Sequence, residues 1–312
     1  MKRRELLKRA AALGFVASMP YTTFGKLSAG SGPVEAAGNP DVSTPTARPN
    51  PLKPPAQGTI PVAFLVSDGA VIIDFCGPWE VFQDAMLPGP AMTMPFQLYT
   101  VAETMKPIHA SGGMQIIPDY TFEAAPAPKV LVIPAQSGKS EATMEWIRKA
   151  TKTTDVTMSV CTGAYQLAAT GLLSGKSATT HHGSYKTFAM DFPDIRLKRG
   201  ARFVEDGNLA TAGGLSSGID LALRVVERYY GREAARATAY QMEYQGQGWM
   251  NPDSNEVYAK ALISTDEHPL CPVCGMDVDP GSASKSVFKG KNYYFCMPAH
   301  KERFDAAPEK WL

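Results

Sequence analysis

The stretch that decides the fold is residues 156–165, which read VTMSVCTGAY. Its first half is apolar and β-branched, and its second half opens a helical pattern. We therefore expect a buried strand that turns sharply into a helix at Cys161. Gly163 and Ala164 are small enough for such a turn.

Similar apolar runs on both sides of this stretch alternate with helix-period segments. The runs are at 60–67, 96–102 and 129–134, and the helical segments are at 79–86, 141–151 and 164–173. This alternation predicts an α/β fold with a parallel sheet and helices on both faces, and with functional loops at the carboxyl ends of the strands. Residues 202–211 predict a hairpin, and Ser216 is placed to cap the next helix.

Composition limits the classes of function. The 312 residues are 44% hydrophobic and 20% charged, which is typical of a globular chain long enough for two domains. No apolar run reaches the roughly 18 residues of a stable membrane span. The net charge is +1, of which the first thirty residues carry +5 and the remainder −4. That balance argues against a nucleic-acid partner.

The amino-terminal residues 1–37 resemble a twin-arginine export signal. Arg3 and Arg4 are followed by Leu-Leu-Lys and then by a short apolar stretch. This signal predicts a periplasmic protein, and the alternative is a basic amphipathic helix on the surface. Residues 38–58 are rich in proline and predict an extended linker.

Cys161 is the leading candidate for a nucleophile. Its thiol is expected at the amino-terminal end of a helix, where the helix dipole should lower its pKa. The alternative is a buried, inert cysteine.

Three motifs together resemble the ThiJ/PfpI family, and in particular its branch of isonitrile hydratases. They are GAVIIDFCGPWEVF at 69–82, CTGA at 161–164 and ATTH at 178–181. The resemblance covers roughly residues 60–245, within a domain placed at 59–247. It implies a flavodoxin-like three-layer sandwich with a mostly parallel sheet, a homodimer, and a catalytic domain without a cofactor.

The resemblance also implies site residues. It makes Cys161 the nucleophile, Asp74 its acidic partner and Thr162 an assisting residue, with Gly77, Gln136 and His181 as candidates for binding a small-molecule substrate. Asp74 has an alternative role as the N-cap of a helix beginning near Pro78. Glu80 is a rival acid that we expect at the surface or a dimer contact.

Two features depart from the family pattern. Ala135-Gln136 stands where the family often has Gly-Gly beside an oxyanion. Cys76 is a second thiol near the expected site, and a disulfide between Cys76 and Cys161 would block the nucleophile.

The last segment, residues 267–312, follows a linker at 248–266 and is too short to bury a comfortable core alone. Cys271 and Cys274, then 21 residues, then Cys296 and His300 give the spacing of a structural metal site. The segment resembles the YHS domain, a treble-clef-like module. Three thiolates and one imidazole suit zinc, while Met276 and Met297 leave copper open. The alternative is a disulfide between Cys271 and Cys274.

Two functions are consistent with these patterns. The first is an exported cysteine-dependent lyase or hydrolase of the isonitrile-hydratase type with an appended metal-binding module. The second is a non-catalytic periplasmic protein that binds or senses a small ligand or a heavy metal such as copper or zinc.

Overall fold

The structure is a computed structural model that describes residues 50–85, 87, 94–260 and 263–312. These residues fall in one compact unit, Pro45–Leu312. The predicted export signal and residues 38–49 of the predicted linker lie outside the described residues. Among the helices of the described ranges, none has the length and apolar character needed to cross a membrane.

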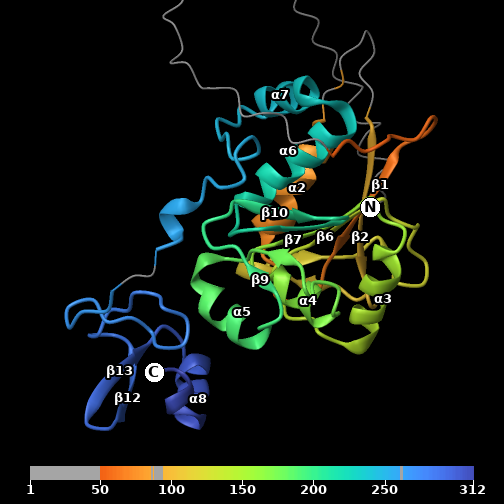
Figure 1. Ribbon diagram of the computed structural model, residues 1–312. Coiled ribbons are helices and arrows are strands. Elements are labelled where there is room, and N and C mark those ends of the chain that lie inside the picture. Colours follow the sequence, from red (N-terminus) through yellow and green to blue (C-terminus); the bar gives the residue numbers. More distant parts are fainter. Residues whose placement is uncertain (1–49, 86, 88–93, 261–262) are drawn as a thin grey trace, which may run out of the picture. The chain divides into compact units, whose positions relative to one another are not determined.

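The centre of the main domain is a seven-stranded sheet in the order β10-β11-β7-β6-β1-β2-β5 (Figure 1). All neighbouring strands are parallel except β10 and β11, which form the predicted hairpin. The strands are β1 (Ile60–Leu65), β2 (Phe96–Ala102), β5 (Tyr120–Thr121), β6 (Val130–Ile133), β7 (Val156–Val160), β10 (Phe203–Asp206) and β11 (Leu209–Ala212).

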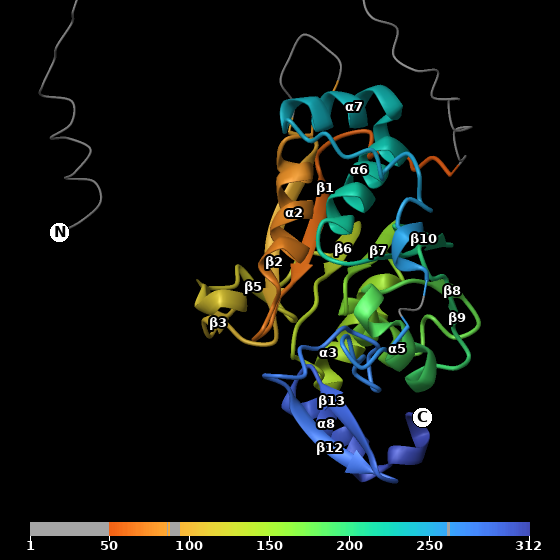
Figure 2. The same cartoon turned by 90° about the vertical axis from the view of Figure 1, so that its left-hand side faces the viewer.

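Helices cover both faces of this sheet (Figures 1 and 2). One face carries α2 (Ile72–Gln83), α6 (Ser217–Tyr230) and α7 (Arg232–Gln241); the other carries α3 (Glu141–Thr151), α4 (Gly163–Ala169) and α5 (Tyr185–Asp191). Alternate residues of β1 enter two separate cores, with Val62 and Phe64 in one and Ala63 and Leu65 in the other. The predicted three-layer α/β sandwich is therefore confirmed.

Two helices differ from their expected bounds. The helix expected at 164–173 is α4, which ends at Ala169. The segment expected at 79–86 begins at Ile72, so Pro78 lies inside α2 instead of at its start. Proline usually marks a helix boundary because it has no N–H to donate. For this reason the sequence favoured a helix that starts near Pro78. The alternative role of Asp74 as an N-cap near Pro78 is wrong, because Asp74 lies in the first turn of α2 and the N-cap is Val71.

Short elements that the sequence did not reveal connect the main ones. They are β3 (Ile108–His109), η1 (Ser111–Gly113), β4 (Gln115–Ile116), β8 (Ser177–Ala178), η2 (His182–Ser184), β9 (Arg196–Leu197) and η3 (Glu256–Tyr258). Two residues are too few for a periodic pattern, so no sequence signal was present to find these strands.

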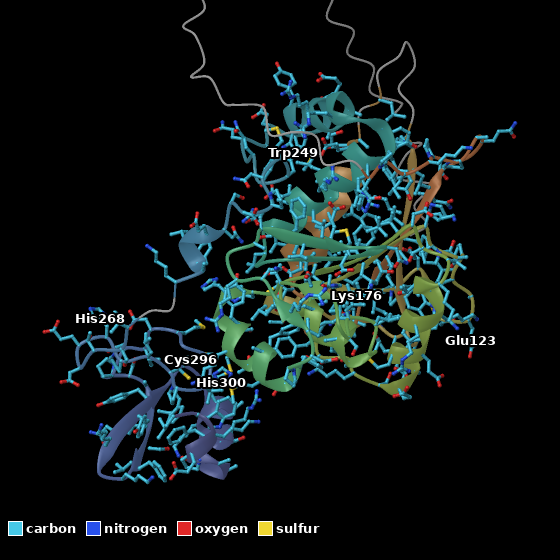
Figure 3. All side chains as sticks on the ribbon, in the orientation of Figure 1. Glu123, Lys176, Trp249, His268, Cys296 and His300 are labelled. Atoms are coloured by element: carbon cyan, nitrogen blue, oxygen red, sulfur yellow. The ribbon has the colours of Figure 1, made fainter. Side chains whose placement is uncertain are left out.

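Part of the predicted linker 248–266 packs on the α/β domain. Trp249, labelled in Figure 3, is only 3% exposed and belongs to the core formed by α2, α6 and α7. The N–H of Arg202 donates to the carbonyl of Pro252. Residues 248–255 are therefore held against the domain, and the predicted domain boundaries stay predictions.

The carboxyl-terminal module consists of the antiparallel hairpin β12 (Ser284–Phe288) and β13 (Lys291–Phe295), the helix α8 (Pro298–Ala306) and the turn η4 (Pro308–Lys310). Its small core joins Phe295, Phe304 and Trp311 to Cys271 and Cys274. The cysteines thus supply part of the packing in a module with few large apolar side chains.

The turn from β7 into α4 requires glycine at position 163. A Cβ on Gly163 would lie 2.2 Å from the carbonyl oxygen of Ile133 and 2.8 Å from that of Pro134. Both atoms belong to backbone at the end of β6 and cannot swing away. The close approach of α4 to β6 therefore depends on this glycine.

We expect Gly163→Ala to lower the free energy of unfolding by about 3 kcal/mol, because the new methyl group overlaps fixed backbone. Chemical denaturation of the full chain measures this change. The matched control is Gly207→Ala in the hairpin turn, where the cost is only that of a positive φ of 72°, about 1 kcal/mol. Equal losses in the two variants would contradict the close-approach argument.

Candidate active site and metal centre

Cys161 occupies the sharp turn between β7 and α4, in a strained backbone conformation. Its φ is 58°, in the left-handed region that residues with a side chain rarely adopt. Two hydrogen bonds hold this peptide: its N–H donates to the carbonyl of Gly213 at 2.8 Å, and its carbonyl accepts from the hydroxyl of Thr180 at 3.0 Å. The strain turns the sulfur toward the end of the sheet, where α2 begins.

Asp74 is the acidic partner of this sulfur. The side chain is 0% exposed, and its Oδ2 accepts the N–H of Ala135 at 3.1 Å. The thiol of Cys161 lies beside this carboxyl group, while Oδ1 has no partner among the described residues. Burial raises the pKa of Asp74 to about 6, and the hydrogen bonds from Ala135 and Cys161 reduce that effect only in part.

The expectation that the pKa of Cys161 is lowered is wrong. Burial, and next the charge of Asp74, raise the pKa of this thiol to about 11. Hydrogen bonds from the backbone of Thr162 and Leu215 and from the Thr162 hydroxyl oppose the shift without overcoming it. Between pH 6 and 11 the pair therefore carries one proton and one negative charge, so the acid and the sulfur share a proton.

Of the remaining candidates, Thr162 lies near the sulfur and His181 lies beside Gly214. Thr162 directs both its N–H and its hydroxyl to Cys161. The His181 ring faces Gly214, where a Cβ would lie 2.4 Å from its Cδ2, and its Nδ1 accepts the N–H of Gly183. Burial and the neighbouring His182 lower the pKa of His181, so the ring is neutral at pH 7.

Gln136 and Gly77 have other partners in the structure. The Gln136 amide donates to the carbonyl of Leu65 and to Gln166, and it accepts from Ser67. Gly77 faces α6, and a Cβ there would lie 2.9 Å from Ile219. The side chain of Gln136 is thus used internally and Gly77 allows two helices to pack, so their binding of substrate stays a prediction.

The rival acid and the extra thiol also have clear positions. Glu80 is exposed on α2, as expected for a surface residue. All five cysteines of the chain are free thiols in the structure. Burial and then Glu80 raise the pKa of Cys76, which keeps it a protonated thiol near neutral pH.

A backbone donor was expected at Ala135-Gln136, and the N–H of Ala135 donates to Asp74. A second donor was missed by sequence reasoning: the N–H of Leu215 reaches the sulfur of Cys161 from the turn before α6. Leu215 has a φ of 40°. A leucine gives no sequence signal for a positive φ, and a backbone donor has no residue type to reveal it.

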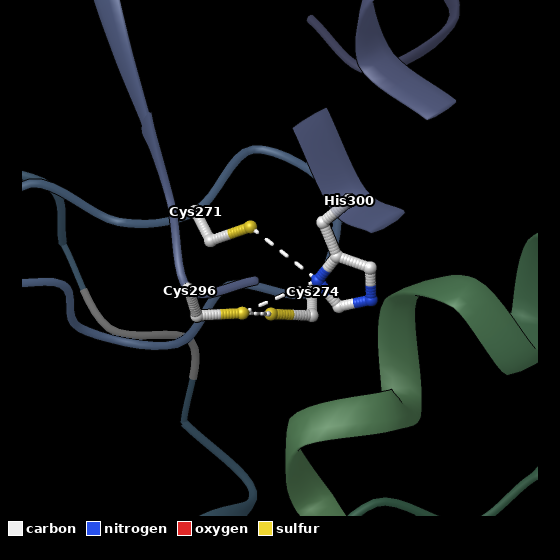
Figure 4. A group of neighbouring side chains, drawn as sticks. All are labelled: Cys271, Cys274, Cys296 and His300. Atoms are coloured by element: carbon white, nitrogen blue, oxygen red, sulfur yellow. Dashed lines mark hydrogen bonds between the residues drawn. The ribbon is translucent and has the colours of Figure 1, made fainter. Parts of the chain in front are cut away.

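The predicted ligands in the carboxyl-terminal module come together in one cluster (Figure 4). One donor atom from each of Cys271, Cys274, Cys296 and His300 lies within 4.8 Å of all the others. The Nδ1 atom of His300 is 3.7 Å from the sulfur of Cys271 and 3.2 Å from that of Cys296, and the sulfurs of Cys274 and Cys296 are 3.5 Å apart. Hydrogen bonding, first from Cys274 and also from His300, lowers the pKa of Cys271.

These distances fit a tetrahedral metal ion. Metal–sulfur bonds of about 2.3 Å place tetrahedral ligand atoms about 3.7 Å apart. The three separations given above between sulfur and Nδ1 atoms, 3.2 to 3.7 Å, match that spacing. A disulfide needs sulfurs about 2 Å apart.

His268, labelled in Figure 3, lies outside the cluster and contacts Asp277.

Comparison with known proteins agrees with both parts of the structure. Residues 61–228, more than half of the chain, match the DJ-1/PfpI family. The chain belongs to this family. Residues 271–312 match the YHS domain, which accounts for the metal-ligand cluster at the carboxyl end.

Three relatives illustrate the range of the family. An isonitrile hydratase from Pseudomonas putida is 35% identical over 188 residues, which are 59% of this chain and 78% of that protein. The HTH-type transcriptional regulator GbdR of Pseudomonas aeruginosa is 26% identical over 67% of this chain and 57% of the regulator. The crystal structure of a ThiJ/PfpI family protein from Pseudomonas syringae aligns with a TM-score of 0.54 and 27% identity, covering 65% of this chain and 84% of that one. Because the relatives include a regulator, the absence of a nucleic-acid partner stays a prediction.

In the DJ-1/PfpI domain, Asp74→Asn should make Cys161 a stronger nucleophile toward an added reagent. Asparagine keeps an oxygen for the N–H of Ala135 but removes the charge that raises the pKa of Cys161. We expect alkylation at pH 8 to accelerate about three- to tenfold. Rates are followed by mass spectrometry of the Cys161 peptide, with Glu80→Gln as the control that leaves the rate unchanged. Slower alkylation of Asp74→Asn would mean that the carboxyl group helps to ionise the sulfur.

In the YHS domain, Cys274→Ser should abolish metal binding. The full chain should hold about one equivalent of zinc or copper, because four ligands close one tetrahedral site. Elemental analysis of the purified protein measures this, and Cys76→Ser is the matched control because Cys76 lies outside the cluster. Equal metal content in both variants would contradict the assignment of the ligands.

Proposed function

We propose that the DJ-1/PfpI domain is a cysteine-dependent lyase of the isonitrile-hydratase type. In this reaction an isonitrile, R–N≡C, adds water to give the N-substituted formamide R–NH–CHO. The observation that carries the proposal is the buried pair of Asp74 and Cys161 that holds one proton. The 35% identity to the Pseudomonas putida isonitrile hydratase supports it.

The single proton of the pair suits the first step. Between pH 6 and 11 the thiol holds this proton. The proton passes by way of the Asp74 carboxylate to the isonitrile carbon while the Cys161 sulfur bonds to the same carbon, which gives a thioimidate, R–N=CH–S–Cys161. In the second step water attacks that carbon and gives one proton to the Asp74 carboxylate. The carbon–sulfur bond then breaks, the nitrogen takes the second proton of the water, and the sulfur and carboxylate keep one proton between them.

The surroundings of the pair favour a small, neutral substrate. The pair carries one negative charge near neutral pH, which disfavours anions. Ile73 precedes Asp74 in sequence, and Leu215 lies in the turn whose N–H reaches the Cys161 sulfur. Their side chains are 38% and 42% exposed and offer apolar surface to a hydrocarbon substituent. The N–H groups of Thr162 and Leu215 stabilise the sulfur as it gains charge.

The metal cluster supports a second candidate function. The ligands Cys271, Cys274, Cys296 and His300 would hold zinc or copper, which supplies a structural cross-link to a small core. In this alternative the sandwich binds a small ligand without turnover and the protein handles or senses metal. Export to the periplasm by the twin-arginine route and assembly as a homodimer are further proposals, drawn from residues 1–37 and the family resemblance.

Turnover of a panel of isonitriles, amides and glyoxals by the reduced, metal-loaded full chain distinguishes the two candidates. We expect formamide from an isonitrile, with kcat/KM reduced at least about a thousandfold in Cys161→Ala, because the nucleophile is lost. His300→Ala is the matched control, since it removes metal and should leave this rate unchanged. Turnover that survives Cys161→Ala would contradict the mechanism, and absence of turnover by the intact protein would favour the binding function.

The rate should also depend on pH in a defined way. The pKa of Asp74 is about 6 and that of Cys161 about 11. Below pH 6 the pair holds two protons and the Asp74 carboxyl can no longer accept the proton of the thiol, so kcat/KM should fall as the pH drops through 6. Above pH 11 the pair holds no proton to donate, so the rate should fall again. A rate that is constant from pH 5 to pH 8 would contradict the shared-proton pair.

A further inference from the structure

We infer that Arg202 is a positioning residue for Cys161, because it fixes the turn at 213–217 from which the Leu215 N–H reaches the sulfur. This inference rests on the proposed role of Cys161 as the nucleophile. It adds to the site a buried network contributed in part by residues 249–255, which lie beyond the region that matches the DJ-1/PfpI family.

The turn at 213–217 touches Cys161 twice. The Gly213 carbonyl accepts the Cys161 N–H at 2.8 Å, and the Leu215 N–H hydrogen-bonds the sulfur. Leu215 has a φ of 40°, which is unfavourable for a residue with a branched side chain. Such a conformation persists only when neighbouring contacts hold it.

Arg202 supplies those contacts with its three guanidinium nitrogens. Nε donates to Asp220 Oδ2 at 2.6 Å, Nη2 donates to Ser216 Oγ at 3.0 Å, and Nη1 donates to Asn255 Oδ1 at 3.2 Å. The side chains of Arg202 and Asp220 are 16% and 1% exposed. A planar guanidinium in such a place fixes three partners at once, which a lysine cannot do.

The bond to Ser216 is informative because this residue was expected to cap α6. Ser216 does stand at the N-cap, but its side chain makes no capping hydrogen bond. Its hydroxyl accepts from Arg202 instead. The entry of α6 is therefore set by the guanidinium and not by the usual local cap.

Residues 249–255 close the network from outside. Asn255 Nδ2 donates to Ser217 Oγ at 3.4 Å, and the Trp249 N–H donates to Asp220 Oδ1 at 2.9 Å. Gly213 leaves room for this packing, since a Cβ there would lie 2.9 Å from Asn255 Nδ2. Residues 249–255, which lead toward the YHS domain, thus help to hold the turn at 213–217, called the donor turn below.

Two other groups that face the sulfur come from outside the turn at 213–217: Asp74 from α2 and Thr162 from the N-cap of α4. The His181 ring packs on Gly214 of the turn and is neutral at pH 7, so it brings no charge to the site. Loss of the Arg202 network should therefore remove one donor to the thiolate and leave the acid in place.

The test is the pH dependence of Cys161 alkylation in the full chain carrying Arg202→Lys. We expect the rate at pH 8 to fall about three- to tenfold and the pH profile to move upward, because a hydrogen bond to the charged sulfur is lost. Asn255→Ala, a milder change, should move the profile the same way. Because alkylation requires no turnover, the result is independent of whether isonitriles are the substrate.

The matched control is Glu205→Gln. Glu205 forms buried ion pairs with Arg224 and Arg228 on α6, so its loss also destabilises this side of the domain, but it does not contact the donor turn. We expect a lower unfolding temperature with an unchanged alkylation profile. An unchanged profile in Arg202→Lys and Asn255→Ala, or an equal shift in Glu205→Gln, would overturn the inference.

Discussion

The site depends on one buried arrangement, in which the Asp74 carboxyl group stands beside the Cys161 thiol. A buried carboxylate is costly unless it is paired or hydrogen-bonded. Here Oδ2 accepts the N–H of Ala135, and Oδ1 has no partner among the described residues. Burial is the largest cause of the raised affinity of this acid for a proton.

The direction of the Cys161 pKa follows from the size of two competing effects. A helix amino terminus contributes about 0.3–1 kcal/mol, which is less than one pKa unit. Desolvation of a buried group shifts its pKa by up to about 3–5 units. The thiol is only 7% exposed and lies beside an acid, so burial prevails. Near neutral pH the pair therefore consists of a protonated thiol beside the Asp74 carboxylate.

Much of the fold could be predicted from the sequence because the determining signals are local. The apolar runs at 96–102 and 156–160 coincide with β2 and β7, and α3 has the predicted limits Glu141–Thr151. Motifs singled out Cys161, Asp74 and Thr162 as candidates, and their roles stay predictions. Leu215 and Arg202 were not singled out, because their contacts arise from backbone direction and from the packing of distant segments. Pro78 shows the opposite case, in which a strong local rule is overridden by the packing of α2 against α6.

The two domains obtain rigidity by different physical means. In the DJ-1/PfpI domain two large cores and the networks around α6 hold a strained turn at Cys161. In the YHS domain the core contains few large side chains, and four clustered side chains that could hold a metal ion, Cys271, Cys274, Cys296 and His300, lie beside it. Since residues 249–255 are anchored to Arg202 and Asp220, the α/β domain does not end where its family match ends. The chain that leads toward the YHS domain first completes the support of the turn at 213–217, which accepts the Cys161 N–H.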